Sequence, residues 1–392
     1  MNVAEYQDCR GQKQKQERFF QMLTKIKYTG LFLQILLLLY ITNARAEEYS
    51  IITGSTVMGQ SFGVPDYGST GELTLVTEMA FFFKTLEIFN LQHMEGETFT
   101  GYRMPMRLQY QPRHDLSLEL GVMLGHDFGD TDRLNQLAPV ARLVYQPSPG
   151  LHILGGTLIP THWIHDAFHD DVQKFRTDVE QGFQLRANQS WLKNDTWLNW
   201  RVREEVVEAE EFEIGMSNQF RLLDDTFRLD SQFMWTHAGG QVSTSGRIEQ
   251  NLIYLAGASV GTRNPLGWKT CEEIRLGYAW FYSRDENDHS SLVKGYGRAW
   301  SAHADFRALQ HFLIRGFGEL YDGDNFASTL GDPLYRLDKY NHLGVNLLFD
   351  VGGDHLFIEA GFVNQWTDDV SNLTYQLSMV WGDGFSLGQI KN

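Results

Sequence analysis

Residues 116–124 read Leu-Ser-Leu-Glu-Leu-Gly-Val-Met-Leu, with an apolar residue at every second position. In a β-strand successive side chains point to opposite faces, so this segment has one apolar face and one more polar face. A similar alternation runs through 102–110, 227–235 and 375–381, with one break at Ser231. Such segments are about 9–12 residues long, which suits a tilted membrane-crossing strand better than the typical soluble strand of about 5–6. The pattern therefore predicts strands that cross a membrane.

The connections between these segments are of two kinds. Short turns such as 147–150 and 264–267 contain Pro and Gly, and they alternate with longer, polar connections. Short turns on one rim and long loops on the other are typical of outer-membrane β-barrels. We therefore expect residues 71–392 to form an all-β, antiparallel up-and-down barrel of about 16 strands, with 14 and 18 as limits. The longer connections are 127–136, 159–177, 204–210, 237–246, 284–293 and 321–337.

An exported soluble β-sandwich or solenoid is the alternative fold. Its strands would be shorter, and its apolar face would point inward rather than outward. The chain shows no internal repeat that would support a solenoid.

The most apolar stretch of the chain is 30–46, and Lys25 and Lys27 precede it. A basic head, an apolar run and small residues at its end predict a secretory signal peptide over residues 1–46. The apolar run 31–41 is shorter than the about 20 residues that a spanning helix needs.

Two further segments precede the predicted barrel. Residues 1–21 are polar and atypical of a signal peptide, and Met22 offers an alternative start. Residues 47–70 lack a clear pattern, and we expect them to form a periplasmic tail or a plug.

Composition narrows the class of protein. The chain has 33 Lys and Arg against 49 Asp and Glu, a formal net charge of −16. A nucleic-acid-binding protein would normally be basic, so that class is excluded. Removal of the predicted signal peptide would leave Cys271 without a disulfide partner, and the chain has no haem-attachment motif. The sequence implies no cofactor.

Charged residues lie on the polar faces of the predicted strands. A charge facing lipid would cost about 2–4 kcal/mol at the membrane midplane, so these residues should face the lumen. They could line a pore, or they could form a salt-bridge network that closes it. Arg298 is expected on the same face. The candidate pore-lining residues are Arg107, Glu119, Arg142, Arg186, Arg201, Arg228, Asp230 and Arg275.

The segment 161–171 holds the densest group of potential metal ligands. It reads Thr-His-Trp-Ile-His-Asp-Ala-Phe-His-Asp-Asp. Imidazole and carboxylate groups together suit zinc or a similar divalent ion. A solvated extracellular loop with no bound ion would have the same composition. The candidate metal ligands are His162, His165, His169 and Asp166.

Several motifs resemble, in order, an uncharacterised family of bacterial outer-membrane β-barrel proteins. The resemblance covers about residues 80 to 382, and it implies a porin-sized barrel without an established activity. The motifs include Phe83-Lys-Thr-Leu-Glu-Ile-Phe-Asn90, Pro139-Val-Ala-Arg-Leu-Val-Tyr-Gln-Pro147, Trp197-Leu-Asn-Trp200, His237-Ala-Gly-Gly-Gln241 and Gly331-Asp-Pro-Leu-Tyr335.

The leading interpretation is a porin-like channel of a Gram-negative outer membrane that passes small polar solutes, and not an enzyme. A barrel of about 16 strands normally leaves room for an aqueous channel. The expected partners are outer-membrane lipid or lipopolysaccharide and the barrel-assembly machinery. A homo-oligomer is compatible with the sequence, which does not decide the oligomeric state. Two alternatives belong to other classes. One is an outer-membrane enzyme of the lipase or protease type, and the other is a sheath for an exported polysaccharide or an electron-transfer partner.

Overall fold

A computed structural model describes residues 69–392 except for several short gaps. The predicted signal peptide and almost all of 47–70 lie outside the described residues. In the described part of the chain, no helix is long and apolar enough to cross a membrane. The gaps are 90–94, 132–135, 171, 174–178, 241–247, 269, 288–291, 352–355, 368–369 and 391–392.

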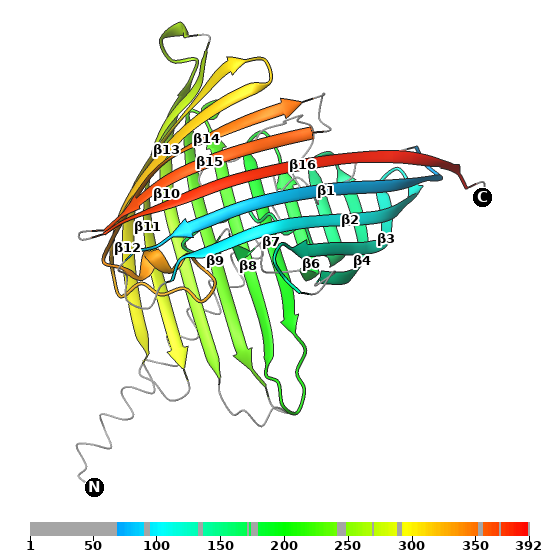
Figure 1. The fold of residues 1–392 in the computed structure, drawn as a ribbon, viewed down its shortest axis with the longest axis horizontal. Coiled ribbons are helices and arrows are strands. Elements are labelled where there is room, and N and C mark those ends of the chain that lie inside the picture. Colours follow the sequence, from blue (N-terminus) through cyan, green and yellow to red (C-terminus); the bar gives the residue numbers. More distant parts are fainter. Residues whose placement is uncertain are drawn as a thin grey trace. The chain divides into compact units, whose positions relative to one another are not determined.

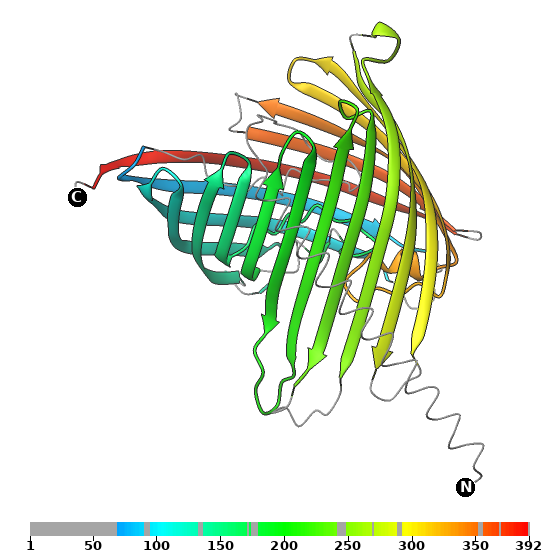
Figure 2. The same ribbon diagram turned by 180° about the vertical axis from the view of Figure 1, so that it is seen from behind.

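The described chain forms a closed barrel of sixteen antiparallel strands. Each strand pairs with its neighbours in sequence, and β1 pairs with β16 to close the sheet (Figures 1 and 2). The predicted antiparallel barrel and its strand number are confirmed. The strands are β1 (Glu72–Glu87), β2 (Glu97–Arg113), β3 (Leu116–Asp127), β4 (Gln136–Ser148), β5 (Leu151–Thr157), β6 (Gln181–Asn188), β7 (Leu192–Val202), β8 (Glu210–Leu222), β9 (Phe227–Gly239), β10 (Glu249–Arg263), β11 (Cys271–Asn287), β12 (Val293–Leu309), β13 (Phe312–Asp324), β14 (Lys339–Val351), β15 (Leu356–Trp366) and β16 (Ser371–Gln389).

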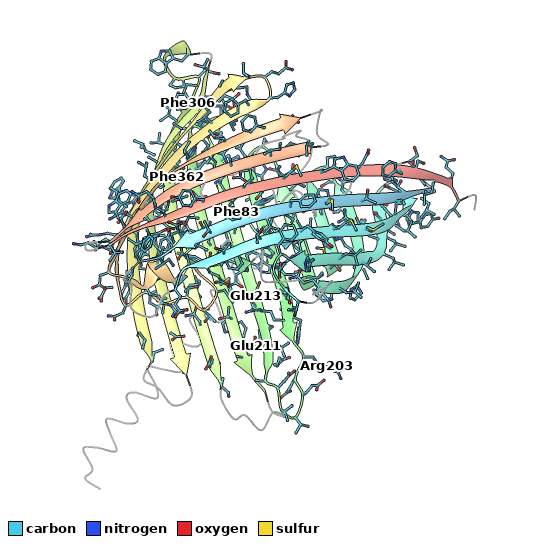
Figure 3. The ribbon with its side chains drawn as sticks, viewed as in Figure 1. Phe83, Arg203, Glu211, Glu213, Phe306 and Phe362 are labelled. Carbon is cyan, nitrogen blue, oxygen red and sulfur yellow. The ribbon has the colours of Figure 1, made fainter. Side chains whose placement is uncertain are left out.

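The outer face of the barrel is apolar. Leu120, Leu276 and Leu343 are 66%, 57% and 61% exposed, as expected for side chains that face hydrocarbon. Phe83 and Phe362 lie on this outer surface (Figure 3). The alternation in the sequence therefore has the predicted orientation, with its apolar side outward.

Arg298 corrects one expectation about the inner face. Its side chain is 63% exposed and forms an ion pair with Asp322. Arg298 lies on the same face of β12 as Trp300, two residues further on, which is also exposed. Arg298 therefore points outward. Its pair lies near the long-loop end of β13, which ends at Asp324, where a charge escapes the cost of facing hydrocarbon.

The inner face of the β1–β4 sector is ionic. Arg107 lies 3.0 Å from Glu78 and 3.5 Å from Glu119, and Arg142 lies 3.4 Å from Glu119. All four groups are buried or nearly so, and opposite charges on neighbouring strands compensate one another. In this sector, ion pairs on the lumen side of the sheet therefore join neighbouring strands.

Candidate functional site

The connection between β5 and β6 folds into the barrel. The chain leaves the wall after Thr157, and Ile159 packs against the inner faces of β3, β4 and β5. Further along, Phe168 packs in a cluster with β9–β14, and Val172 packs against β1 and β16. The described part of this loop therefore contacts the wall on several sides of the barrel, and its side chains occupy much of the lumen at this level. We call the described residues of this connection, 158–170, 172–173 and 179–180, the inner loop.

The connection between β13 and β14 folds inward and holds the inner loop in place. The amide of Asp170 donates to the carbonyl of Leu330, and the amide of Asp332 donates to the carbonyl of Asp166, both at 2.8 Å. The hydroxyl of Ser328 donates to the carbonyl of Phe168. The short helix η3 (Pro333–Arg336) ends this connection. We call residues 325–338 the clamp loop.

An apolar cluster joins the two loops to the wall. It includes Phe168 of the inner loop, Leu334 of the clamp loop and Phe281 of β11, each almost completely buried. The strand residues of this cluster, such as Phe281, point inward although they are apolar, because the loops cover them. The inner face of β9–β14 therefore behaves as a protein core at this level rather than as the wall of a water-filled channel.

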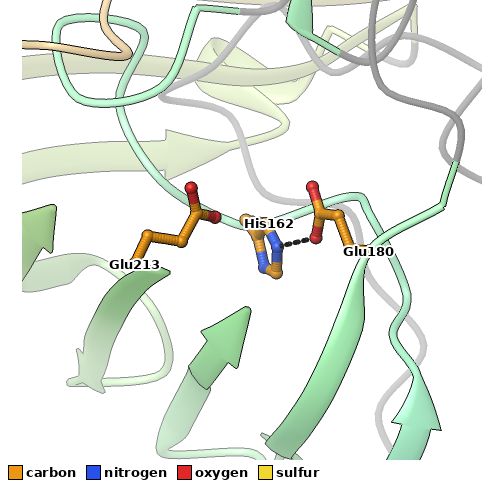
Figure 4. Close-up of side chains that lie close together, drawn as sticks. All are labelled: His162, Glu180 and Glu213. Carbon is orange, nitrogen blue, oxygen red and sulfur yellow. Dashed lines mark hydrogen bonds and ion pairs between the residues drawn. The ribbon is translucent and has the colours of Figure 1, made fainter. Parts of the chain in front are cut away.

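His162 of the inner loop is the centre of a buried polar group. Its Nε2 lies 2.7 Å from Oε2 of Glu180, and its Nδ1 lies 3.2 Å from Oδ2 of Asp195. The imidazole stacks on the indole of Trp197, with ring centroids 3.7 Å apart. The indole N–H donates to Glu213 at 3.0 Å. Figure 4 shows the imidazole between the carboxylates of Glu180 and Glu213.

This arrangement fixes the charge of the imidazole. A carboxylate faces each ring nitrogen, and only an imidazolium can donate to both. Burial opposes the charge, but the carboxylates of Glu180 and Asp195 outweigh it and raise the pKa of His162 to about 10. His162 is therefore a proton donor at neutral pH, next to the carboxylate of Glu213.

The same residues could hold a divalent ion. One ligand atom from each of His162, Glu180 and Glu213 lies within 4.8 Å of the others. In the structure, however, the imidazolium already supplies a positive charge between the carboxylates, and its two nitrogens both have protein partners. Only His162 of the four predicted metal ligands belongs to this group, and the predicted metal site stays a prediction.

His165 of the inner loop has different partners. Its Nδ1 accepts a hydrogen bond from the amide of Ala167, so Nε2 carries the proton that it donates to Glu319 at 3.0 Å. The hydroxyl of Tyr335 donates to the other oxygen of Glu319 at 2.6 Å. His165 thus links the inner loop, the wall and the clamp loop.

The remaining predicted metal ligands lie elsewhere on the inner loop. The ring centroid of His169 is 6.0 Å from that of His162, in an edge-to-face arrangement. Asp166, together with His165, Glu319 and Tyr335, lines a cavity of about 120 Å³. This cavity lies between the two loops and the part of the wall that runs from β12 through β16 to β1. The four predicted ligands therefore do not converge on one point.

Most of the candidate pore-lining residues are buried on the inner face. Seven of the eight have an exposed fraction of 7% or less, and Arg201 is exposed near the end of β7. Several form the ion pairs described above, and Arg228 and Arg275 both pair with Asp225 and Glu273. Whether any of them lines a path for solutes stays a prediction.

Sequence reasoning missed the partners that complete the His162 group. Glu180, Asp195 and Glu213 lie 18, 33 and 51 residues after His162, on or beside three strands. Alternation places Asp195, Trp197 and Asn199 on one face of β7, which was the available signal. No local motif joins these residues to a loop histidine.

The closed barrel, its apolar outer face and its inner ion pairs define an outer-membrane β-barrel protein. The sequence matches the family described as lipid A 3'-O-deacylase-type over residues 65–346. The chain belongs to this family. The resemblance to an outer-membrane barrel family is therefore confirmed.

The family corrects one sequence-based expectation. Its description names an enzymatic activity, so the expectation that the chain is not an enzyme is wrong. The acids and histidines of the sequence are spread over many strands and loops, so their abundance did not single out a catalytic group. No protein of curated function matches the chain.

Solved structures agree with the fold. A loop-deletion mutant of OmpT, an outer-membrane protein of Vibrio cholerae, is 9% identical, with a TM-score of 0.50 over 80% of this chain and all of that chain. An anion-selective porin from Comamonas acidovorans is 9% identical, with a TM-score of 0.47 over 79% of this chain and 98% of its own. At this identity the first likeness shows the fold alone. The protein is placed in the bacterial outer membrane, in contact with its lipid.

Proposed function

We propose that the protein is an outer-membrane hydrolase that removes an ester-linked acyl chain from a lipid A-type glycolipid, with the His162 group as its active site. The family match over residues 65–346 is the observation that carries this proposal. The substrate class follows from the family's description, and lipopolysaccharide surrounds an outer-membrane barrel. The assembly machinery as a partner and a homo-oligomer stay predictions.

The filled lumen favours hydrolysis over passage of solutes. The inner loop and the clamp loop pack against opposite parts of the wall, and their apolar side chains form a core with β7 and β9–β14. A pore for polar solutes needs a continuous polar path, which such a core interrupts.

The His162 group offers both an acid and a base for ester hydrolysis. The carboxylate of Glu213 accepts a proton from water as the water oxygen attacks the ester carbonyl carbon. The imidazolium of His162 donates a hydrogen bond to the carbonyl oxygen, where negative charge develops. His162 then gives its proton to the leaving sugar oxygen. The proton on Glu213 moves to His162 and restores the imidazolium. The products are a free fatty acid and a sugar hydroxyl.

Two neighbours position this pair. Asp195 receives Nδ1–H of His162, which leaves Nε2–H to turn from Glu180 toward the substrate. Trp197 stacks on the imidazole and donates to one oxygen of Glu213. Both partners of the acid–base pair are thus held by groups on β7, which is part of the rigid wall.

Purified full-length protein in detergent, incubated with hexa-acylated lipid A, tests the proposal. We expect mass spectrometry to show loss of one acyl chain. Glu213→Gln should lower the rate by about 100-fold or more, since general base catalysis typically contributes about 10²–10⁴. Glu319→Gln, which changes an equally buried carboxylate beside the other histidine, is the matched control and should retain most of the activity. Absence of acyl loss with the wild-type protein would overturn the proposal.

A further inference from the structure

Two neighbouring strands are too short to cross the membrane. β5 has 7 residues and β6 has 8, whereas every other strand has between 11 and 19. A tilted membrane-crossing strand needs about 9–11 residues. β5 ends where the inner loop begins, and β6 begins where the inner loop ends. Both of these strand ends lie on the rim of the long loops. Since long loops face the cell exterior in this class of barrel, the described residues of these two strands do not extend across the outer leaflet.

The strands on either side continue beyond this hairpin. The pairing of β4 with β5 ends at Arg142 and Gly156, while β4 runs on to Gln136 and pairs there only with β3. The pairing of β6 with β7 ends at Gly182 and Asn199. In the described residues, the segment 136–141 of β4 therefore has a strand partner on one side only. We call the space between this segment and the end of β7 the wall gap.

Side chains take part in the hydrogen bonds at the point where the pairing of β4 with β5 ends. The amide of Ala141 donates to the hydroxyl of Thr157 at 3.1 Å. The guanidinium of Arg142 donates to the carbonyls of Thr157 and Leu158, at 2.9 and 3.1 Å. These contacts end the β-ladder and stabilise the open edge. Such satisfaction of polar groups is needed in lipid, where no water can replace a missing strand.

Glycine keeps the rim of the wall gap thin. Gly156 has a φ of +99°, and a Cβ there would lie 2.1 Å from the carbonyl oxygen of Ala141. Gly155 faces the ring of Phe183, which is 68% exposed on the lipid side. Leu137 and Trp200, on the strands that flank the gap, are also exposed and apolar. The surroundings of the gap therefore suit a hydrocarbon chain.

The inner loop lies directly behind the wall gap. Leu158 and Ile159 are completely buried there, and Ile159 packs against Val140 of β4. His162 follows three residues later, and Glu180 immediately precedes β6. Among the described residues, Leu158 and Ile159 therefore lie between this part of β4 and the His162 group.

We propose that the wall gap between β4 and β7 admits an acyl chain of an outer-leaflet lipid, which displaces Leu158 and Ile159 and brings its ester to the His162 group. The proposal rests on the proposed function for what happens at that group. The route itself follows from strand length, the one-sided pairing of β4 and the apolar rim. The occupant is a lipid chain because the gap opens at the depth of the outer leaflet.

Labelling from within the membrane tests the route without any need for hydrolysis. Ile159→Cys and Val144→Cys are made in a Cys9→Ala, Cys271→Ala background. Ile159 and Val144 are both completely buried in the same cluster, but Val144 lies where β4 still pairs with β5. An N-alkyl maleimide that partitions into liposomes should label Ile159→Cys at least 10-fold faster than Val144→Cys. A charged, membrane-impermeant thiol reagent should label neither.

Gly155→Trp narrows the gap from the lipid side. A Cβ at Gly155 meets the Phe183 ring at 3.7 Å, an ordinary contact, so the variant should fold. It should reduce both the labelling of Ile159→Cys and the release of acyl chains. Equal labelling at the two cysteines, or none at Ile159→Cys, would overturn the route, for instance if a second copy of the chain covers the gap. Labelling without hydrolysis would instead overturn only the proposed function.

Discussion

Two buried histidines lie three residues apart on the inner loop, yet their surroundings give them different chemistry. His162 has a carboxylate at each nitrogen and stacks on Trp197. His165 has a backbone amide at one nitrogen and Glu319 at the other. The first arrangement requires an imidazolium. In the second, a neutral imidazole satisfies both hydrogen bonds, while burial lowers and the Glu319 carboxylate more strongly raises the pKa of His165. The comparison shows that a histidine's role is set by which group faces its second nitrogen.

The largest expected effect separates the two histidines by activity. His162→Gln removes the proton donor of the proposed mechanism, so acyl release should fall by about 100-fold or more. His165→Gln should leave the rate within about threefold of wild type, because Gln can still donate to Glu319. Mass-spectrometric rates for both variants, each checked for folding by heat-modifiable gel mobility, make the comparison. Similar losses in the two variants would abolish the distinction.

The next effect concerns the clamp that holds His165 in place. A Cβ at Gly331 would lie 2.0 Å from the carbonyl oxygen of Ala167, so Gly331→Val must push the clamp loop away from the inner loop. We expect planar-bilayer recordings to show stable ion-conducting openings in the variant and none of that size in the wild type.

Gly316→Ala is the control, because a Cβ at Gly316 of β13 meets nothing within 4 Å. It should behave as the wild type does. Large stable openings in the wild-type protein would contradict the filled lumen and return the channel to consideration.

A smaller effect is expected from the hydrogen bond that completes the His165 group. Tyr335→Phe removes the donor to Glu319, which should destabilise the barrel by about 2 kcal/mol, as for other hydrogen bonds to charged groups. Urea unfolding in detergent measures this change. Since Tyr335 lies outside the His162 group, the acyl-release rate at low urea should stay unchanged, and a parallel loss of activity would show that the two groups are coupled.

The mildest perturbation is a change of pH. The carboxylates that surround His162 outweigh burial and hold its pKa near 10, so the imidazolium persists through neutral and mildly alkaline solution. The proposed mechanism needs this proton, and the rate should therefore change little between about pH 7 and 9 and fall as pH rises through about 10. If the rate already decreases as the pH rises toward about 8, the proton donor is another group.

The sequence predicted the strands well and the interior poorly. Alternation such as that of Leu116–Leu124 gave the correct lipid-facing side, because side chains of a strand must alternate and charge is excluded from hydrocarbon. The same rule misses Phe281 and Ile253, which are apolar and point inward. Their environment is set by loops that lie more than 40 residues away in sequence, and periodicity within a strand carries no information about that contact.

The candidate site divides in the same way. The density of His and Asp in 161–171 singled out the loop that holds the proposed site. The metal site predicted from His162, His165, His169 and Asp166 stays a prediction, and the structure places these side chains beside different parts of the wall.

The sequence by itself determined that this chain crosses the outer membrane as a barrel of about sixteen strands, since periodicity and turn spacing are local properties. Only the tertiary structure decided that two loops pack inside the barrel, that His162 meets Glu180, Asp195 and Glu213, and that, among the described residues, 136–141 of β4 pair with a strand on one side only. These features arise where segments distant in sequence pack together. Packing depends on the shape and charge of all the partners at once, which no single stretch of the chain contains.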